Sequence, residues 1–223
     1  MNKFIDRKAL IELVKDNSVV AIGGFLAVGT PAAIIDLIVD AGIRDLTVIA
    51  NDTAFQDKGI GKLVVNGQLR KVITSHIGTN PESGRQMNNG KLEVELVPQG
   101  TLAERLRCGG AGLGGVLTRT GVGTVVAENK EVLKVDGIEY LLETALHADI
   151  ALIKAAKADQ NGNLICRRAA INFNPVMAMA ADLVIAEVEQ VVEIGGIDPD
   201  DVTIPGMLVD YLFMPERSET SGA

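Results

Sequence analysis

The sequence predicts an α/β fold in which a mostly parallel sheet is flanked by helices. Two observations carry this prediction. Short apolar runs rich in Val and Ile alternate with helical patterns along most of the chain, as is typical of parallel sheets. In addition, 47% of the 223 residues are hydrophobic and only 3% are aromatic, which suits an aliphatic core. We expect one domain over residues 1–214 and a flexible polar tail over residues 215–223, because no linker or internal repeat divides the chain.

The first half of the chain alternates regularly between helices and strands. A helix is expected over residues 6–15, followed by a buried strand over residues 19–22. A glycine loop then leads into a helix over residues 32–41, with Thr30 as its expected N-cap and Gly42 as its C-cap. The same reasoning predicts strands over residues 46–50, 71–75 and 94–97, and helices over residues 61–66, 81–89 and 101–108.

The second half departs from this alternation before returning to it. Residues 109–115 are so rich in glycine that we expect a loop. Residues 121–142 hold short β-like pieces around Asp136-Gly137, which indicates a small antiparallel excursion on the sheet edge. The α/β pattern then resumes with strands over residues 150–154 and 183–188, a hairpin turn at Asn161-Gly162 and a helix over residues 175–181.

Composition excludes several classes of function. The net charge of −8 opposes nucleic-acid binding, which needs clustered basic charge. The longest apolar stretch, residues 19–28, is too short to span a bilayer, and residues 1–8 do not have the pattern of a signal peptide. Cys108 and Cys166 match no metal-ligand spacing, so we expect reduced core thiols. We therefore expect a cytoplasmic protein without a metal site that binds neither nucleic acid nor membranes.

The candidate ligand loop comprises Gly23, Gly24, Phe25, Leu26, Ala27, Val28 and Gly29. Adjacent glycines at the carboxyl end of a strand let backbone N–H groups approach a ligand, and the following helix N-terminus adds a positive dipole. The spacing matches neither the dinucleotide fingerprint nor a P-loop. The alternative is a tight strand-to-helix turn that binds no ligand.

Two amide side chains follow predicted strands at the same edge of the sheet. Gln99 lies at a strand-to-helix junction, where a neutral amide can donate to a developing oxyanion, although it can equally cap the next helix. Asn51 follows the second predicted strand and is a weaker candidate, because Asn is also a common turn residue. His76 and His147 have no partners at triad spacing. The carboxylate pairs Glu93/Glu95 and Glu187/Glu189 are more typical of solvated strand faces than of acid/base dyads.

These motifs together resemble a known family. Residues 17–31 are similar to the first signature of the family I coenzyme A transferases. The resemblance is reinforced, in the family's order, by Asn51-Asp52-Thr53, residues 93–105, Gly109-Gly110-Ala111-Gly112 and Asn172-Phe173-Asn174-Pro175. It extends over residues 8–213 and implies the NagB/RpiA/CoA transferase-like fold. More closely, the chain resembles the A (alpha) subunits of two-subunit bacterial enzymes that move CoA between acetoacetate and acetate or butyrate.

The resemblance implies a ping-pong reaction through a glutamyl-CoA thioester. In this family the catalytic glutamate lies in a Ser-Glu-Asn-Gly type motif on the B (beta) subunit, and this chain has no such motif. By the same resemblance, residues 23–29 bind CoA and Gln99 donates to the thioester oxygen across the subunit interface. CoA is then a substrate, no tightly bound cofactor or metal is implied, and the assembly is α2β2 or larger.

One residue departs from the family's pattern. Many relatives carry an Arg immediately before Asn-Phe-Asn, where this chain has Ile171, and the departure concerns acyl specificity more than reaction class. Two other functions are weighed against CoA transfer. A sugar-phosphate isomerase of related fold would need its own catalytic carboxylate and a phosphate site, and neither is evident. A non-catalytic metabolite-binding module of a transcription regulator is disfavoured by the net charge of −8 and by the lack of an attached DNA-binding segment.

Overall fold

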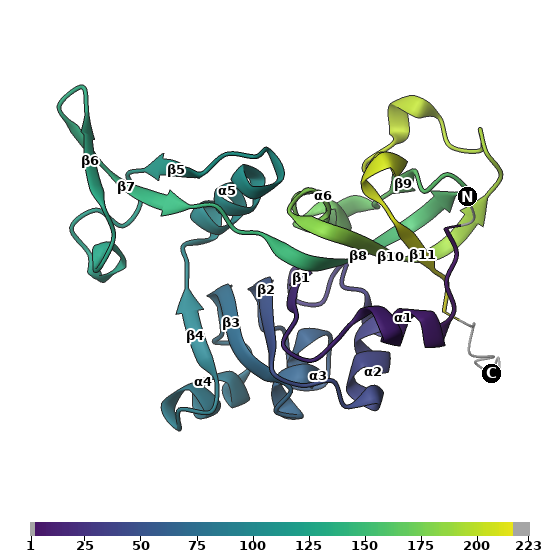
Figure 1. Ribbon diagram of the computed structural model, residues 1–223, viewed down its shortest axis with the longest axis horizontal. Coiled ribbons are helices and arrows are strands. Elements are labelled where there is room, and N and C mark those ends of the chain that lie inside the picture. The colour runs from purple at the N-terminus through teal and green to yellow at the C-terminus, as the bar shows by residue number, and fades with distance from the viewer. Residues whose placement is uncertain (1–2, 216–223) are drawn as a thin grey trace.

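The computed structural model describes residues 3–215 and has the predicted α/β class. Its main sheet has the strand order β11-β10-β8-β1-β2-β3-β4, and every neighbouring pair along this path is parallel (Figure 1). The short strand β9 (Leu164–Ile165) pairs antiparallel with β8. The other strands are β1 (Val19–Ile22), β2 (Leu46–Asp52), β3 (Leu69–His76), β4 (Glu93–Leu96), β8 (Ala148–Asp159), β10 (Ala181–Val192) and β11 (Tyr211–Phe213).

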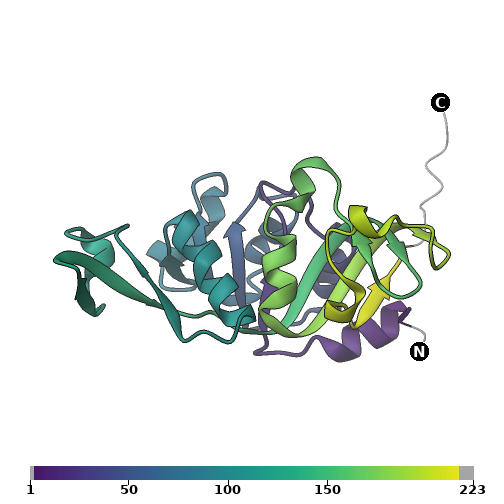
Figure 2. The same ribbon diagram turned by 90° about the horizontal axis from the view of Figure 1, so that it is seen from above.

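Helices cover both faces of this sheet and bury a separate aliphatic cluster on each. One cluster joins Leu10 of α1, Ile35 of α2 and Leu63 of α3 to the sheet, and the other joins Leu102 of α5 and Met177 of α6 to its opposite face. Figure 2 gives the view from above. The helices are α1 (Arg7–Leu13), α2 (Ala32–Ala41), α3 (Ile60–Val65), α4 (Pro81–Asn88), α5 (Gln99–Gly110) and α6 (Asn174–Met179).

The start of α2 and the end of α5 differ from their predictions for physical reasons. Thr30 is not the N-cap of α2, because Pro31 takes that position without a side-chain hydrogen bond. The predicted loop over residues 109–115 begins too early, since α5 continues through Gly110. The reason is packing: a Cβ on Gly109 would meet the carbonyl oxygen of Leu146, and one on Gly110 would meet Met179. The glycines thus permit close helix packing. Gly42 does end α2 in the left-handed conformation, as predicted.

The antiparallel excursion forms a sheet of its own. Its order is β5-β7-β6, with β5 (Gly115–Thr118), β6 (Val132–Val135) and β7 (Ile138–Thr144). It projects away from the main sheet in both views, so its predicted place on the sheet edge was wrong (Figures 1 and 2). Asp136 and Gly137 make the predicted turn, with φ of 50° and 78°. At the base of this arm the buried Glu143 pairs with Lys130 at 2.6 Å.

The predicted domain, residues 1–214, and the flexible tail stay predictions, and residues 216–223 lie outside the described residues. The predicted Asn161-Gly162 turn does connect β8 to β9. Within residues 3–215, no helix is long and apolar enough to cross a membrane. Cys108 and Cys166 are buried and form no disulfide.

Candidate active site

The candidate site lies where parallel strands of the main sheet end. The loop of residues 23–30 follows β1, Asn51 and Asp52 are the last two residues of β2, and Gln99 begins α5 after β4. Ligands of parallel α/β proteins bind at this carboxyl edge of the sheet. The structure brings the two predicted amides together, because Gln99 Nε2 donates to Asn51 Oδ1 at 2.7 Å. Gln99 is exposed and Asn51 is buried.

A chain of hydrogen bonds runs from this amide pair to the glycine loop. Asn51 Nδ2 donates to Asp52 Oδ2 at 2.7 Å, and the backbone N–H of Leu26 donates to the same oxygen at 2.9 Å. In the sequence analysis, Asp52 is named only as part of a family motif, and no role is predicted for it. A carboxylate two positions after the apolar run of residues 48–50, at the end of a buried strand, is the pattern that points to it. The residues of two strand ends and one helix start therefore form one polar network.

The loop after β1 contains a tight turn whose tip is apolar. Phe25 and Val28 exchange backbone hydrogen bonds of 3.0 and 2.8 Å. Between them, Leu26 and Ala27 have φ of 47° and 70°, the left-handed conformation of a two-residue type I′ turn, which usually contains Asn or Gly. Phe25 and Val28 are 42% and 49% exposed. The turn thus presents apolar side chains and backbone outward.

The protein itself fills the space beside the three glycines of this loop. A Cβ on Gly23 would meet the Asn174 side chain, one on Gly24 would meet the Thr30 hydroxyl, and one on Gly29 would meet Ala170. Gly24 and Gly29 also have φ of 127° and 74°, which strains any other residue. The glycines therefore serve the turn, and the Phe25–Val28 tip is the part that faces outward. CoA binding by residues 23–29 stays a prediction.

Asn174 holds this loop against the neighbouring strand. Its Oδ1 accepts the Lys154 N–H at 3.0 Å, and its Nδ2 donates to the carbonyl oxygens of Gly29 and Ala170 at 2.9 and 2.7 Å. The side chain is fully buried. In the sequence analysis, Asn174 is named as a motif residue, but no role is predicted for it. Its role depends on contacts between segments about 145 residues apart, and no local pattern indicates them.

A cavity of about 260 Å³ opens beside Gly29 and has a cationic lining. Lys154 pairs there with Glu187 at 2.8 Å and Glu189 at 3.3 Å. Burial alone lowers the pKa of Lys154, but the hydrogen bond and charge of Glu187 raise it above its usual value, so the ammonium stays charged. The cavity is lined by Gly29, Lys154, Ala156, Arg167, Arg168, Ala170 and Glu189.

The interpretation of Glu187 and Glu189 as a solvated pair was wrong for Glu187. Its side chain is buried, and its Oε2 accepts the N–H of Ile34 at 3.0 Å. The Lys154 ammonium and the first turn of α2 thus both donate hydrogen bonds to this carboxylate. Ile171, the expected departure from the family pattern, is half exposed on the short turn Arg168–Ile171.

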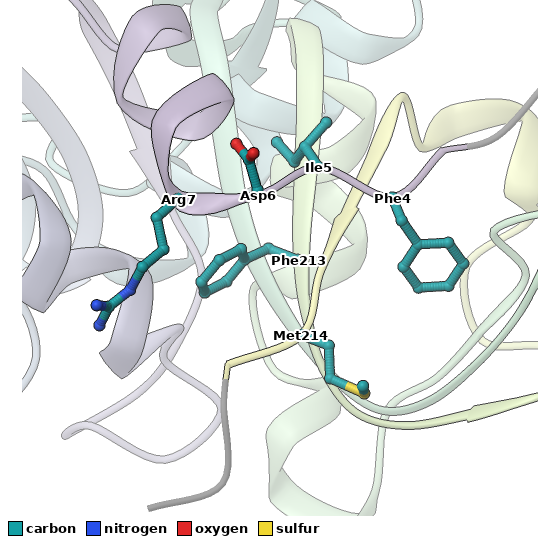
Figure 3. Close-up of a pocket in the computed structure, with 6 residues that line it drawn as sticks. All are labelled: Phe4, Ile5, Asp6, Arg7, Phe213 and Met214. Atoms are coloured by element: carbon teal, nitrogen blue, oxygen red, sulfur yellow. The ribbon is translucent and has the colours of Figure 1, made fainter.

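A second pocket, of about 400 Å³, lies where the N-terminal segment meets β11 (Figure 3). It contains none of the candidate residues, and β11 is separated from β2 by β10, β8 and β1. Within residues 3–215, no group of three or more His, Cys, Asp or Glu side chains is arranged to hold a metal ion. The pocket is lined by Phe4, Ile5, Asp6, Arg7, Phe213 and Met214.

Fold and site together define a class of protein: a parallel α/β protein with an exposed amide and a strained turn at the carboxyl edge of its sheet. Comparison with known proteins gives the family. The coenzyme A transferase family model matches residues 6–214. The chain is 53% identical over 205 residues to the alpha subunit of acetate CoA-transferase from Escherichia coli (strain K12), covering 92% of this chain and 93% of that protein. The chain therefore belongs to the coenzyme A transferase family.

Two further relatives carry related names. The alpha subunit of the acetoacetyl-CoA:acetate/butyrate CoA transferase from Clostridium acetobutylicum is 47% identical over 211 residues, covering 95% of this chain and 97% of that protein. The corresponding subunit of the succinyl-CoA:3-ketoacid coenzyme A transferase from Xanthomonas campestris pv. campestris (strain B100) is 50% identical over 218 residues, covering 97% and 90%. These names confirm the CoA-transferase class and favour it over an isomerase or an effector-binding module.

Solved structures share the fold. The acyl-CoA transferase YdiF from Escherichia coli O157:H7 superimposes with a TM-score of 0.85 at 22% identity, covering 96% of this chain and 47% of that one. The glutaconate coenzyme A-transferase from Acidaminococcus fermentans gives 0.84 at 20% identity, covering 95% and 75%. The chain thus spans about half the length of YdiF. The fold predicted from the sequence resemblance is confirmed.

Proposed function

We propose that this chain is the alpha subunit of a short-chain acyl-CoA:acetate or acetoacetate CoA transferase and acts together with a beta subunit. Relatives with 45–53% identity are named as the alpha or equivalent subunits of CoA transferases, which supports a two-subunit enzyme. The observation that carries the proposal is the amide pair at the sheet edge, where Gln99 is exposed and held by Asn51. This chain supplies the donors, and the partner supplies the nucleophile.

The proposed reaction proceeds in two half-reactions. A glutamate from the partner chain attacks the acyl carbonyl of acyl-CoA and expels the CoA thiolate, giving a mixed anhydride. The thiolate attacks the glutamyl carbonyl, so the first carboxylate leaves and a glutamyl-CoA thioester remains. A second carboxylate then reverses these steps and departs as its CoA ester. Neither half-reaction requires a redox change or a net proton transfer.

Gln99 is the proposed oxyanion donor for this chemistry. Its amide carries two N–H groups, and the hydrogen bond to Asn51 uses one of them. The second is free to donate to the thioester oxygen as negative charge develops there. Such a donor acts in the transition state, so its loss lowers kcat by about 10²–10³-fold. Asn51 orients it and touches no reacting atom in this scheme.

Residues 23–29 are the proposed CoA-binding segment. The outward Phe25–Val28 turn and the cationic cavity beside Gly29 support this proposal, since CoA joins phosphates to a pantetheine arm whose methyl and methylene groups can pack on apolar side chains. We further propose an α2β2 or larger assembly in the cytoplasm, one domain over residues 1–214, and no tightly bound cofactor. Ile171 lies on the turn that lines this cavity, where it is positioned to affect which acyl groups are accepted.

Intact-mass spectrometry tests the division of labour. The purified complex is mixed with acetyl-CoA or acetoacetyl-CoA without an acceptor acid, and the masses of both subunits are measured. We expect the mass of bound CoA on the beta subunit, with this chain unmodified. A CoA adduct on this chain would contradict the proposal and redirect the search to its own carboxylates.

A further inference from the structure

The carboxylate of Asp52 lies between the loops that follow β1 and β2. It is only 4% exposed, and within residues 3–215 it forms no ion pair with a Lys, Arg or His side chain. A buried carboxylate without a cation is costly unless N–H groups satisfy it. Three N–H groups donate to Asp52: the backbone N–H groups of Leu26 and Ala54 and the side-chain NH₂ of Asn51.

The two oxygens of Asp52 hold different loops. Oδ1 accepts the N–H of Ala54 at 2.7 Å, in the loop after β2. Oδ2 accepts the N–H of Leu26 at 2.9 Å, in the loop after β1, and Asn51 Nδ2 at 2.7 Å. Leu26 and Ala54 both have positive φ, 47° and 50°. The carboxylate thus binds the backbone of each loop at a residue in the unfavourable left-handed conformation.

The carboxylate also sets the direction of the amide chain. Both oxygens of Asp52 accept backbone N–H groups, so Asp52 is an acceptor and Asn51 turns its NH₂ group toward it. Its Oδ1 then faces Gln99, which must donate from Nε2. Ser75 Oγ donates to the backbone oxygen of Asn51 at 2.7 Å and holds that strand end in place. An acceptor-only group at one end therefore fixes the orientation of the exposed amide at the other.

We propose that Asp52 is a positioning residue that aligns Gln99 and the Phe25–Val28 turn as one unit. It touches no substrate; it acts through Asn51 on Gln99 and through the Leu26 N–H on the turn. The inference rests on the proposed function, because it assigns Asp52 to the same transfer reaction. It adds a coupling between the donor amide and the loop proposed to bind CoA.

The direct test is Asp52→Asn in the complex with the beta subunit. Asparagine has the same shape but replaces one acceptor oxygen with NH₂, so one orientation opposes the N–H of Ala54 and the other opposes that of Leu26. We expect kcat to fall about tenfold to a hundredfold, as for a misplaced catalytic group. The KM for acyl-CoA rises as well, because the turn proposed to bind CoA loses a proper acceptor for its Leu26 N–H, so kcat/KM falls more than kcat.

Asp159 offers a matched control elsewhere in the fold. It is also 4% exposed, and it accepts hydrogen bonds from the N–H groups of Asn161 and Asn163 and from Asn163 Nδ2 at the β8–β9 turn. Asp159→Asn removes the same chemistry away from the amide pair. We expect a similar loss of thermal stability and an unchanged kcat. An equal loss of kcat in both variants would reduce Asp52 to a structural residue and overturn the proposal.

A double-mutant cycle with Gln99→Ala separates positioning from general damage. If Asp52 acts through Gln99, adding Asp52→Asn to Gln99→Ala lowers kcat by less than threefold further, well short of additivity. Full additivity would overturn the proposal. Should the wild-type complex transfer no CoA at all, the proposed function fails, and hydrogen exchange of peptides containing Leu26 and Ala54 becomes the test. Faster exchange in Asp52→Asn than in Asp159→Asn supports the alignment, and equal exchange overturns it.

Discussion

The loops after β1 and β2 have the same sequence pattern but differ in backbone conformation and hydrogen bonding. Residues 25–29 and 55–59 both follow the pattern Phe-x-x-x-Gly and lead into a helix, and each makes an isolated β-bridge across its turn. The second turn has one backbone hydrogen bond between bridge partners, from Lys58 to Phe55, and its central residues have no positive φ. The first has two bonds and two left-handed residues.

The difference shows where this fold accepts strain. The central residues are apolar in the first turn, Leu26 and Ala27, and polar in the second, Gln56 and Asp57. Both loops are held by side chains, the first by Asp52 and Asn174 and the second by Asp52 and Thr79 at Ala54. Of the two turn tips, however, only the first contains left-handed residues. Strained backbone persists when its surroundings over-determine it, and it clusters at functional sites. We therefore regard the first loop as the functional one and the second as its support.

The largest expected effect is a loss of kcat on changing the Gln99 amide, which lies outside both loops. In the complex, Gln99→Ala should lower kcat by about 10²–10³-fold with a smaller change in KM, because the lost donor acts on the developing oxyanion. Steady-state kinetics measures both. Gln56→Ala, at the exposed tip of the second turn, is the matched control and should leave kcat unchanged. Unchanged turnover in Gln99→Ala would remove this residue from the mechanism.

The next effect concerns the bracing of the first loop. Asn174→Ala leaves the Gly29 and Ala170 carbonyls and the Lys154 N–H without their partner. The free energy of unfolding should fall by about 2–4 kcal/mol, measured by urea denaturation. Asn172→Ala is the control within the same motif. Its partly exposed side chain also donates to two carbonyls, and we expect a loss of about 1 kcal/mol or less. Equal losses would show that burial at Asn174 matters little.

A paired glycine substitution sharpens the comparison of the two turns directly. Ala27 has φ of 70°, whereas Asp57 has no positive φ. Ala27→Gly relieves strain and should be neutral or raise stability by about 0.5 kcal/mol, while Asp57→Gly should lower it by about 0.5–1 kcal/mol. Thermal unfolding of the two variants tests the opposite signs. Matching shifts would mean that the turns are equally strained.

The smallest effect is chemical. Cys166 precedes residues 167–170, which contact the first loop at Gly29. Burial raises the pKa of the Cys166 thiol to about 11. Because the folded pKa exceeds the unfolded value of about 9, this group favours the folded state below pH 9 and loses that contribution as pH rises toward 11. At pH 8 iodoacetamide should therefore label Cys166 more slowly than a free thiol. Labelling as fast as free cysteine would show that this segment opens readily.

The sequence predicted the sheet and much of its edge for identifiable reasons. Residues 19–22 form β1 as expected, because a short apolar run between a turn and a glycine loop has few alternatives. Gln99 and Asn51 were placed at one edge because parallel strands bring their carboxyl ends together. The structure supplies the hydrogen bond between them.

Local sequence patterns could not predict contacts between residues that lie far apart in the chain. The glycine pattern indicated missing side chains at Gly23 and Gly24, but it could not show that Asn174 and Thr30 fill the space. Similarly, Gly109 and Gly110 looked like loop residues, although they extend α5 because Leu146 and Met179 pack against them. Asp52 was quoted only within a motif, since its role depends on which N–H groups three segments bring to it.

The most direct measurement is CoA transfer by reconstitution. The beta subunit, this chain and their mixture are assayed separately for transfer from acetoacetyl-CoA to acetate, each purified from a host lacking related transferases. We predict transfer by the mixture alone, with Gln99→Ala in the mixture reduced about 10²–10³-fold. Transfer by this chain without its partner would contradict the assignment of the nucleophile to the beta subunit.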